Sequence, residues 1–129
     1  MTTEKIRDAL PPDIARVYAS CITEDLRKIA ELRREMDDYV DGLREQAESD
    51  AFLDLKTALC VWRGCVRLLD ALENSPSTDA HAAVQAATDY FILEDDAESD
   101  DSVIGFDDDL LVVEETFRLL GWPSGDLTS

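Results

Sequence analysis

The chain has 129 residues, of which 30 are Asp or Glu and 12 are Lys or Arg, so its formal net charge is −18. This length gives one domain with a real core, and a hydrophobic content of 45% argues against a disordered chain. The charge disfavours nucleic acid and anionic membrane surfaces as partners. Because no apolar run reaches the length of a membrane span and residues 1–5 lack a signal-peptide pattern, we expect a cytoplasmic protein.

The charge is unevenly distributed along the chain. Residues 1–72 have a net charge of −4, whereas residues 73–129 have a net charge of −14 and a single basic residue, Arg118. A generally acidic proteome would acidify both halves, so the asymmetry indicates a local function. The competing explanation for the negative charge is that the whole protein surface is adapted to salt, as in generally acidic proteomes.

Three cysteines, Cys21, Cys60 and Cys65, lie in apolar helical contexts without a C-x-x-C spacing. An odd number of cysteines without a disulfide framework predicts buried thiols in a reducing compartment. The only histidine, His81, lies near the start of an alanine-rich helix and is expected at the surface. Without a Cys–His pair or a glycine-rich phosphate loop, we expect no catalytic residues and no enzyme activity.

The sequence of residues 1–48 predicts a short helical turn followed by one long helix. Residues 1–10 form a short helical turn, expected to fray, which the prolines at 11 and 12 end. A long amphipathic helix then runs over 13–48, and Gly42 allows a bend or an early end. Its apolar residues alternate at spacings of three and four, as in a coiled-coil seam. The seam consists of Ile29, Leu32, Met36, Tyr39 and Leu43.

Three more helices are expected. The second runs over 50–73 and ends at an Asn-Ser-Pro-Ser turn, and the third runs from about 77 to 93. An acidic loop follows, and a fourth helix opens at Asp107 and ends at Gly121, with residues 124–129 as a frayed tail. The predicted fold is therefore all-α: one domain, a compact bundle of about four helices, with the acidic loop between the third and fourth. Trp62 and Trp122 are interpreted as packing residues.

The acidic loop has a partial match to a calcium-binding loop. Nine of the sixteen residues from 94 to 109 are acidic and none is basic. With Asp96 at position 1, Glu98, Asp100 and Asp107 fall at positions 3, 5 and 12. However, Asp101 occupies the position that requires Gly, and position 12 lacks the longer Glu. No cofactor is therefore expected, and Ca²⁺ or Mg²⁺ binding is kept as an alternative.

The Asp107–Asp109 run is also a candidate for a two-metal hydrolytic centre. Such a centre would need further carboxylates, which Asp89, Glu114 and Glu115 could supply. No histidine pattern supports them. Capping of the helix N-terminus by solvated carboxylates is the favoured interpretation.

One motif resembles a known family. It consists of Tyr90-Phe91-Ile92-Leu93-x-Asp95-Asp96, then Asp100-Asp101, then Gly105-Phe106-Asp107-Asp108-Asp109. The stretch resembles the YkvA-like family of small bacterial helical domains of unknown function. The turn here lacks the family's prolines and is more acidic. The resemblance implies an all-helical fold with this turn as its signature, and no activity. Tyr90, Gly105 and Phe106 would then be structural residues of the motif.

These patterns favour a non-enzymatic interaction module or regulator whose C-terminal half docks a basic protein. An inhibitor or immunity protein that masks a nucleic-acid-binding cleft is one form of it. The alternatives are a divalent-cation-binding protein that uses the 95–109 loop, and a homodimer through the seam, for which packing within one chain is the favoured interpretation. The expected partner-binding residues are Asp95, Asp96, Glu98, Asp100, Asp101, Asp107, Asp108 and Asp109.

Overall fold

The computed structural model describes residues 2–50, 53–93 and 107–122, and this part of the chain is all-α, with six helices and no strand. The helices are α1 (Thr2–Ala9), α2 (Pro12–Cys21), α3 (Ile29–Ala47), α4 (Leu55–Asn74), α5 (Thr78–Leu93) and α6 (Asp107–Leu120). None of these helices is long and apolar enough to cross a bilayer.

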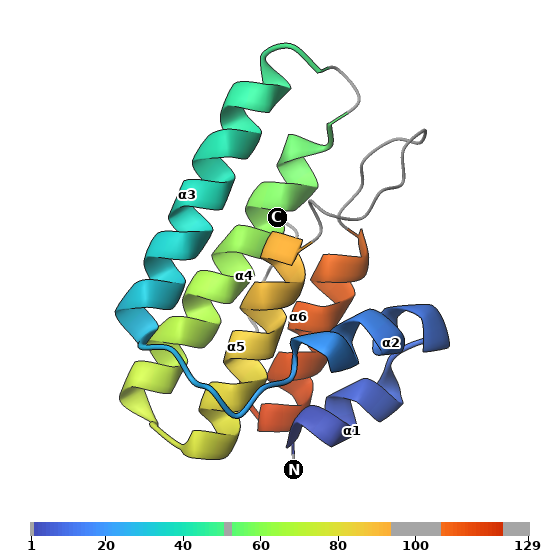
Figure 1. Ribbon diagram of the computed structural model, residues 1–129, viewed down its shortest axis with the longest axis vertical. Coiled ribbons are helices and arrows are strands. Elements are labelled where there is room, and N and C mark those ends of the chain that lie inside the picture. Colours follow the sequence, from blue (N-terminus) through green and yellow to red (C-terminus); the bar gives the residue numbers. More distant parts are fainter. Residues whose placement is uncertain (1, 51–52, 94–106, 123–129) are drawn as a thin grey trace.

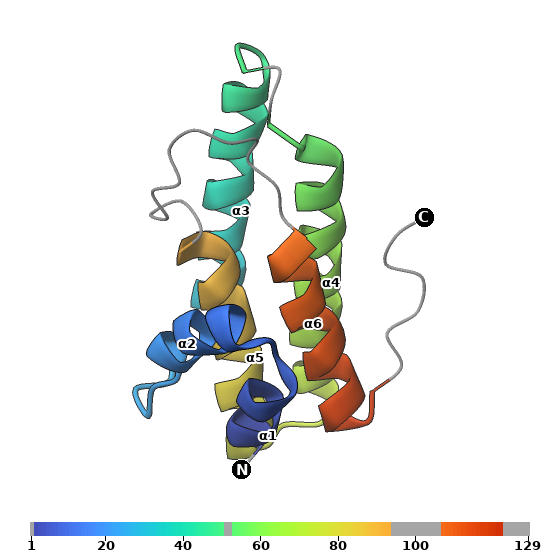
Figure 2. The same ribbon diagram turned by 90° about the vertical axis from the view of Figure 1, so that its right-hand side faces the viewer.

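The four longer helices pack side by side, and the two short ones cover one end of them (Figure 1). α3 packs on α4 and α5, while α6 packs on α4 and α5 from the other side. α1 contacts both α5 and α6, and α2 lies across α5 (Figure 2). α5 is therefore the central helix, in contact with each of the other five.

The long helix predicted over 13–48 is wrong, because it is two helices. α2 ends at Cys21 and α3 begins at Ile29, and an extended segment, residues 22–28, crosses α5 between them (Figure 1). The Thr23 hydroxyl accepts a hydrogen bond from the Asp25 amide at 3.0 Å. Such a local side-chain bond gives the backbone an alternative to the helix. The apolar periodicity is present on both sides of the break, so periodicity alone could not reveal it.

The N-terminal helix is ordered by packing, which corrects the expectation of a frayed end at 1–10. Ile6 is completely buried and Leu10 is 6% exposed. The backbone N–H and the hydroxyl of Thr2 both donate to the carboxylate of Asp79 at the start of α5. A short helix is marginal alone, so these tertiary contacts stabilise α1.

The other predicted elements agree more closely with the structure. The third and fourth predicted helices correspond to α5 and α6, whereas α4 begins at Leu55 instead of residue 50. Asp54 is its N-cap, since its carboxylate accepts from the Thr57 amide at 3.1 Å. α3 continues through Gly42. The predicted acidic loop and the predicted tail lie outside the described residues, apart from the helix start at Asp107.

The seam lies in the core of a single chain. Leu32 and Met36 are fully buried, Leu43 is 5% exposed, and Ile29 and Tyr39 pack against the core from its edge. The Tyr39 ring meets Phe91 of α5 edge-on at 5.0 Å between centroids. The seam therefore packs within the chain, and a second copy could reach it only if the core opened.

Candidate functional site

Only part of the predicted partner-binding surface lies in the described residues. Asp107, Asp108 and Asp109 form the first turn of α6. Tyr90 of the family-like motif is buried at the end of α5, at 6% exposure. The remaining predicted residues lie outside the described part of the chain, and they are Asp95, Asp96, Glu98, Asp100, Asp101, Gly105 and Phe106.

The three aspartates that open α6 have different environments. Asp107 and Asp108 are exposed, whereas Asp109 is only 1% exposed. Successive helical residues point about 100° apart, so a third consecutive aspartate turns toward the core. The expectation that Asp109 binds a partner is therefore wrong, because its carboxylate does not reach the surface. Asp107 and Asp108 remain candidates.

Asp109 shares the interior with two thiols. Burial raises the pKa of Cys65, and the negative charge of Asp109 raises it further. Burial is also the main reason that the pKa of Cys21 is raised to about 11, with Asp89 and then Asp109 adding to it and a hydrogen bond from Ser20 opposing it. A thiol with a raised pKa is a poor nucleophile at neutral pH. These cysteines are buried and free, as the sequence predicts.

Several acidic residues of the C-terminal half bind partners within the chain. Asp89 pairs with Arg27, and Glu73 accepts from Arg33 at 2.8 Å. Glu115 accepts from Arg118 at 2.9 Å. By contrast, Asp107, Asp108 and Glu114 are exposed and form no ion pair within the described residues. The outward-facing charge of this half, as far as it is described, is therefore concentrated on α6.

A polar face of α5 holds the extended segment 22–28. The Gln85 carboxamide accepts from the Arg27 amide at 2.7 Å and donates to the Asp25 carbonyl at 3.1 Å. Nε2 of His81 donates to the Arg27 carbonyl at 2.7 Å. Asp89 binds the guanidinium of Arg27, which also reaches Glu35 at 3.1 Å.

This arrangement was not predicted from the sequence, and His81 was expected at the surface. The available signal was the spacing of His81, Gln85 and Asp89, four residues apart, which puts them on one helical face. Gln85 is completely buried. A buried amide needs partners, and the segment that crosses α5 supplies them.

Two carboxylates of α5 have shifted pKa values in opposite directions. Desolvation raises the pKa of Asp89, although Arg27 acts to lower it. Hydrogen bonds from the hydroxyl and the amide of Thr2 lower the pKa of Asp79. Both carboxylates bind groups from the N-terminal part of the chain: Asp89 binds Arg27, and Asp79 binds Thr2.

The described residues hold no group of three or more His, Cys, Asp or Glu side chains that could bind a metal ion. Of the predicted calcium ligands, Asp107 is exposed, and Asp96, Glu98 and Asp100 lie outside the described part. The carboxylates named for a hydrolytic centre do not assemble there, since Asp89 pairs with Arg27 and Glu115 with Arg118.

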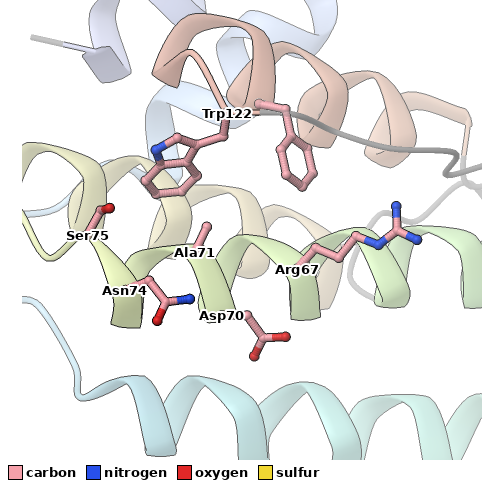
Figure 3. A pocket seen from close by; sticks show the side chains of 7 residues that line it. Arg67, Asp70, Ala71, Asn74, Ser75 and Trp122 are labelled. Atoms are coloured by element: carbon pink, nitrogen blue, oxygen red, sulfur yellow. The ribbon is translucent and has the colours of Figure 1, made fainter.

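The two tryptophans lie on different surfaces. Trp62 is half-buried, its indole N–H donates to Asp37 at 3.1 Å, and the guanidinium of Arg44 lies 5.8 Å from its ring centroid. Trp122 borders a cleft of about 350 Å³ between the C-terminal parts of α4 and α6 (Figure 3). We call it the aromatic cleft; its lining residues are Arg67, Asp70, Ala71, Asn74, Ser75, Phe117 and Trp122. Both tryptophans pack against the core, as the sequence predicts, whereas the cleft beside Trp122 was not predicted.

Comparison with known proteins adds no relative: no family model, curated protein or solved structure matches this chain. The resemblance of residues 90–109 to the YkvA-like family therefore stays a prediction.

Proposed function

We propose that this protein is a non-enzymatic, acidic interaction module that docks a basic protein partner through its C-terminal half. The observation that carries the proposal is the exposure of Asp107 and Asp108, without an ion pair in the described residues, at the head of α6. This helix start belongs to the half of the chain whose net charge is −14. Three buried free thiols fit a reducing compartment such as the cytoplasm.

The electrostatics of α6 support a cationic partner. The N-terminus of a helix carries about half a positive charge, which only partly offsets two exposed carboxylates. Glu114 adds another exposed negative charge to the same helix. Within an overall net charge of −18, these exposed groups would steer a basic surface toward α6. A regulator of a basic protein and an inhibitor that covers a nucleic-acid-binding cleft both fit this arrangement.

Titration with a lysine nonapeptide tests the proposal. Because exposed charges are screened over ~10 Å at 0.1 M salt, we expect the association constant to fall at least tenfold between about 20 mM and about 300 mM salt. The double substitution of Asp107→Lys and Asp108→Lys should weaken binding at low salt by a similar factor. Calorimetry gives the constants, and circular dichroism checks that the fold is kept.

The matched control reverses two exposed aspartates on the outer face of α3. Asp38→Lys with Asp41→Lys makes the same change in net charge, and both residues are exposed. The proposal requires a clearly smaller effect from this pair than from the pair on α6. Equal effects would show that only total charge matters, and the docking surface would then be rejected.

A further inference from the structure

The helix cap that ends α6 shapes the aromatic cleft. Gly121 has φ = +74°, the left-handed conformation that ends many helices. The Trp122 amide donates to the Phe117 carbonyl at 3.0 Å, and the Gly121 amide donates to the Arg118 carbonyl at 3.2 Å. This bonding pattern turns the chain back, so that Trp122 and Phe117, two rings from one helix end, both line the cleft opposite Ala71 of α4.

We propose that the aromatic cleft receives the guanidinium group of an arginine side chain from the basic partner. This inference rests on the proposed function and adds to it a second contact, made at the far end of α6 from Asp107. It assigns a specific cation to a specific site, whereas the acidic surface only attracts positive charge.

The charges around the cleft favour a cation at the end near Trp122. α4 and α6 both have their C-termini here, and each terminus carries about half a negative charge. α4 has no basic residue in its last turn, and Arg118 in the last turn of α6 is bound to Glu115. Arg33 binds both Asp70, at 2.7 Å, and Glu73, at 2.8 Å, so one guanidinium offsets only part of the negative charge of the two carboxylates. The helix C-termini, this remaining negative charge and the aromatic faces together favour a cation at this end of the cleft.

Arg67 limits where the cation can lie. Its side chain extends along α4 away from Trp122 (Figure 3). The Arg67 side chain itself lines that end of the cleft and takes up the space there. A second guanidinium would accordingly lie beside Trp122, close to the exposed Asn74 and Ser75.

The shape and the polar groups select guanidinium over ammonium. A planar guanidinium stacks on an indole face, and this contact is stronger than that of a compact, strongly hydrated ammonium. The side-chain oxygens of Asn74 and Ser75 form no hydrogen bond within the described residues, so they can accept from the N–H groups of the guanidinium. A cleft of about 350 Å³ has room for such a side chain.

Fluorescence of Trp122 tests the proposal. Trp62→Phe leaves Trp122 as the only tryptophan, and the probes are an arginine nonapeptide and the lysine nonapeptide, neither of which contains an aromatic residue. We expect the arginine peptide to change the Trp122 emission in a saturable way and to bind more tightly than the lysine peptide. By calorimetry, Trp122→Leu should weaken the arginine peptide roughly fivefold or more and leave the lysine peptide nearly unchanged.

A second variant fills the cleft without removing the indole. Ala71→Leu should weaken the arginine peptide to a similar degree, whereas Ala30→Leu, at an exposed position of α3, should not. If both peptides bind and neither Trp122→Leu nor Ala71→Leu discriminates between them, the cleft proposal is overturned and the acidic-surface proposal stands. If neither peptide binds at low salt, both proposals are overturned. Binding seen only in a chain that ends at Trp122 would assign the cleft to residues 123–129 and also overturn the proposal.

Discussion

At the scale of single residues, burial separates carboxylates that look alike in the sequence. Asp107, Asp108 and Asp109 are consecutive, yet only Asp109 is buried, at 1% exposure. A buried carboxylate contributes to the fold through its local contacts, whereas an exposed one contributes mainly charge. Substitutions at these adjacent positions should therefore have different effects.

Asp109→Ala should destabilise the protein more than Asp108→Ala. Loss of a buried, engaged polar group costs about 1–3 kcal/mol, while an exposed surface substitution usually stays within about 0.5 kcal/mol. Urea unfolding followed by circular dichroism measures both free energies. Equal losses for the two variants would show that the buried position of Asp109 has no energetic role.

The lowered pKa of Asp79 predicts one acid-dependent part of the stability. Because the folded pKa of Asp79 lies below the usual pKa of an aspartate, ionised Asp79 stabilises the fold at higher pH, and the contribution is lost as the pH falls through the folded pKa. We expect Asp79→Asn to unfold with a weaker pH dependence than the wild type between about pH 5 and pH 2. Thermal melts at a series of pH values check this. An unchanged slope would contradict a role for the bonds from Thr2.

The pH dependence that Asp89 gives to the stability should have the opposite sign to that of Asp79, because desolvation raises the folded pKa of Asp89. The folded state binds a proton more readily than the unfolded state there, so this group adds stability as the pH falls toward and below its folded pKa. Comparing Asp89→Asn with Asp79→Asn in the same melts separates the two contributions by sign.

At the scale of elements, the segment 22–28 depends on side chains of α5 for its position. Gln85 makes two hydrogen bonds to its backbone, and His81 makes a third. Within the described residues, these are the hydrogen bonds that side chains of another element make to its backbone. The segment is thus fixed by polar bonds at defined positions.

Gln85→Ala should loosen this segment. Two backbone groups would lose their partner in a partly buried site, so we expect a loss of about 2–4 kcal/mol. Hydrogen exchange of the Arg27 amide should become much faster. Gln46→Ala is the control, since Gln46 is exposed and, within the described residues, its side-chain amide donates only one long hydrogen bond, of 3.4 Å, to Asp50. An Arg27 amide that stayed protected in Gln85→Ala would rule out this account.

Two glycines in or beside helices should respond oppositely to alanine. Gly121 has φ = +74°, so Gly121→Ala should cost about 1–2 kcal/mol and disturb the position of Trp122. Gly42 lies inside α3 with open space where a Cβ would stand, so Gly42→Ala should gain about 0.5–1 kcal/mol. Chemical unfolding of the two variants provides the measurement. A loss at Gly42 would mean that α3 requires its glycine.

At the scale of the whole molecule, the sequence was sufficient for the fold class and for α5 and α6. Their capping residues and their turns are local signals, so the boundaries could be predicted from neighbours in the chain. The break between α2 and α3 could not, because Gln85, which binds the segment between them, lies about 60 residues away in the chain. The burial of Asp109 and the aromatic cleft likewise depend on which helices become neighbours.

The burial of the seam residues predicts that a charge placed among them will unfold the whole chain. Leu32 is fully buried, so Leu32→Lys should unfold the protein instead of separating a dimer. Val17, which is 42% exposed, is the one large hydrophobic residue on the surface of the described part of the chain. Light scattering coupled to size exclusion gives the mass of the wild type and the variant. A folded Leu32→Lys monomer obtained from a wild-type dimer would contradict this prediction.

The contacts around α5 also bear on the order of folding during synthesis. Thr2 binds Asp79, 77 residues later in the chain, and Arg27 binds Asp89, 62 residues later. Contacts between distant positions form late because a long loop must close first. On a ribosome, the first 28 residues would therefore emerge without their binding partners and wait for residues 78–93. The segment up to residue 28 is made before residues 78–93, and we expect it to reach its native place only after they have been made.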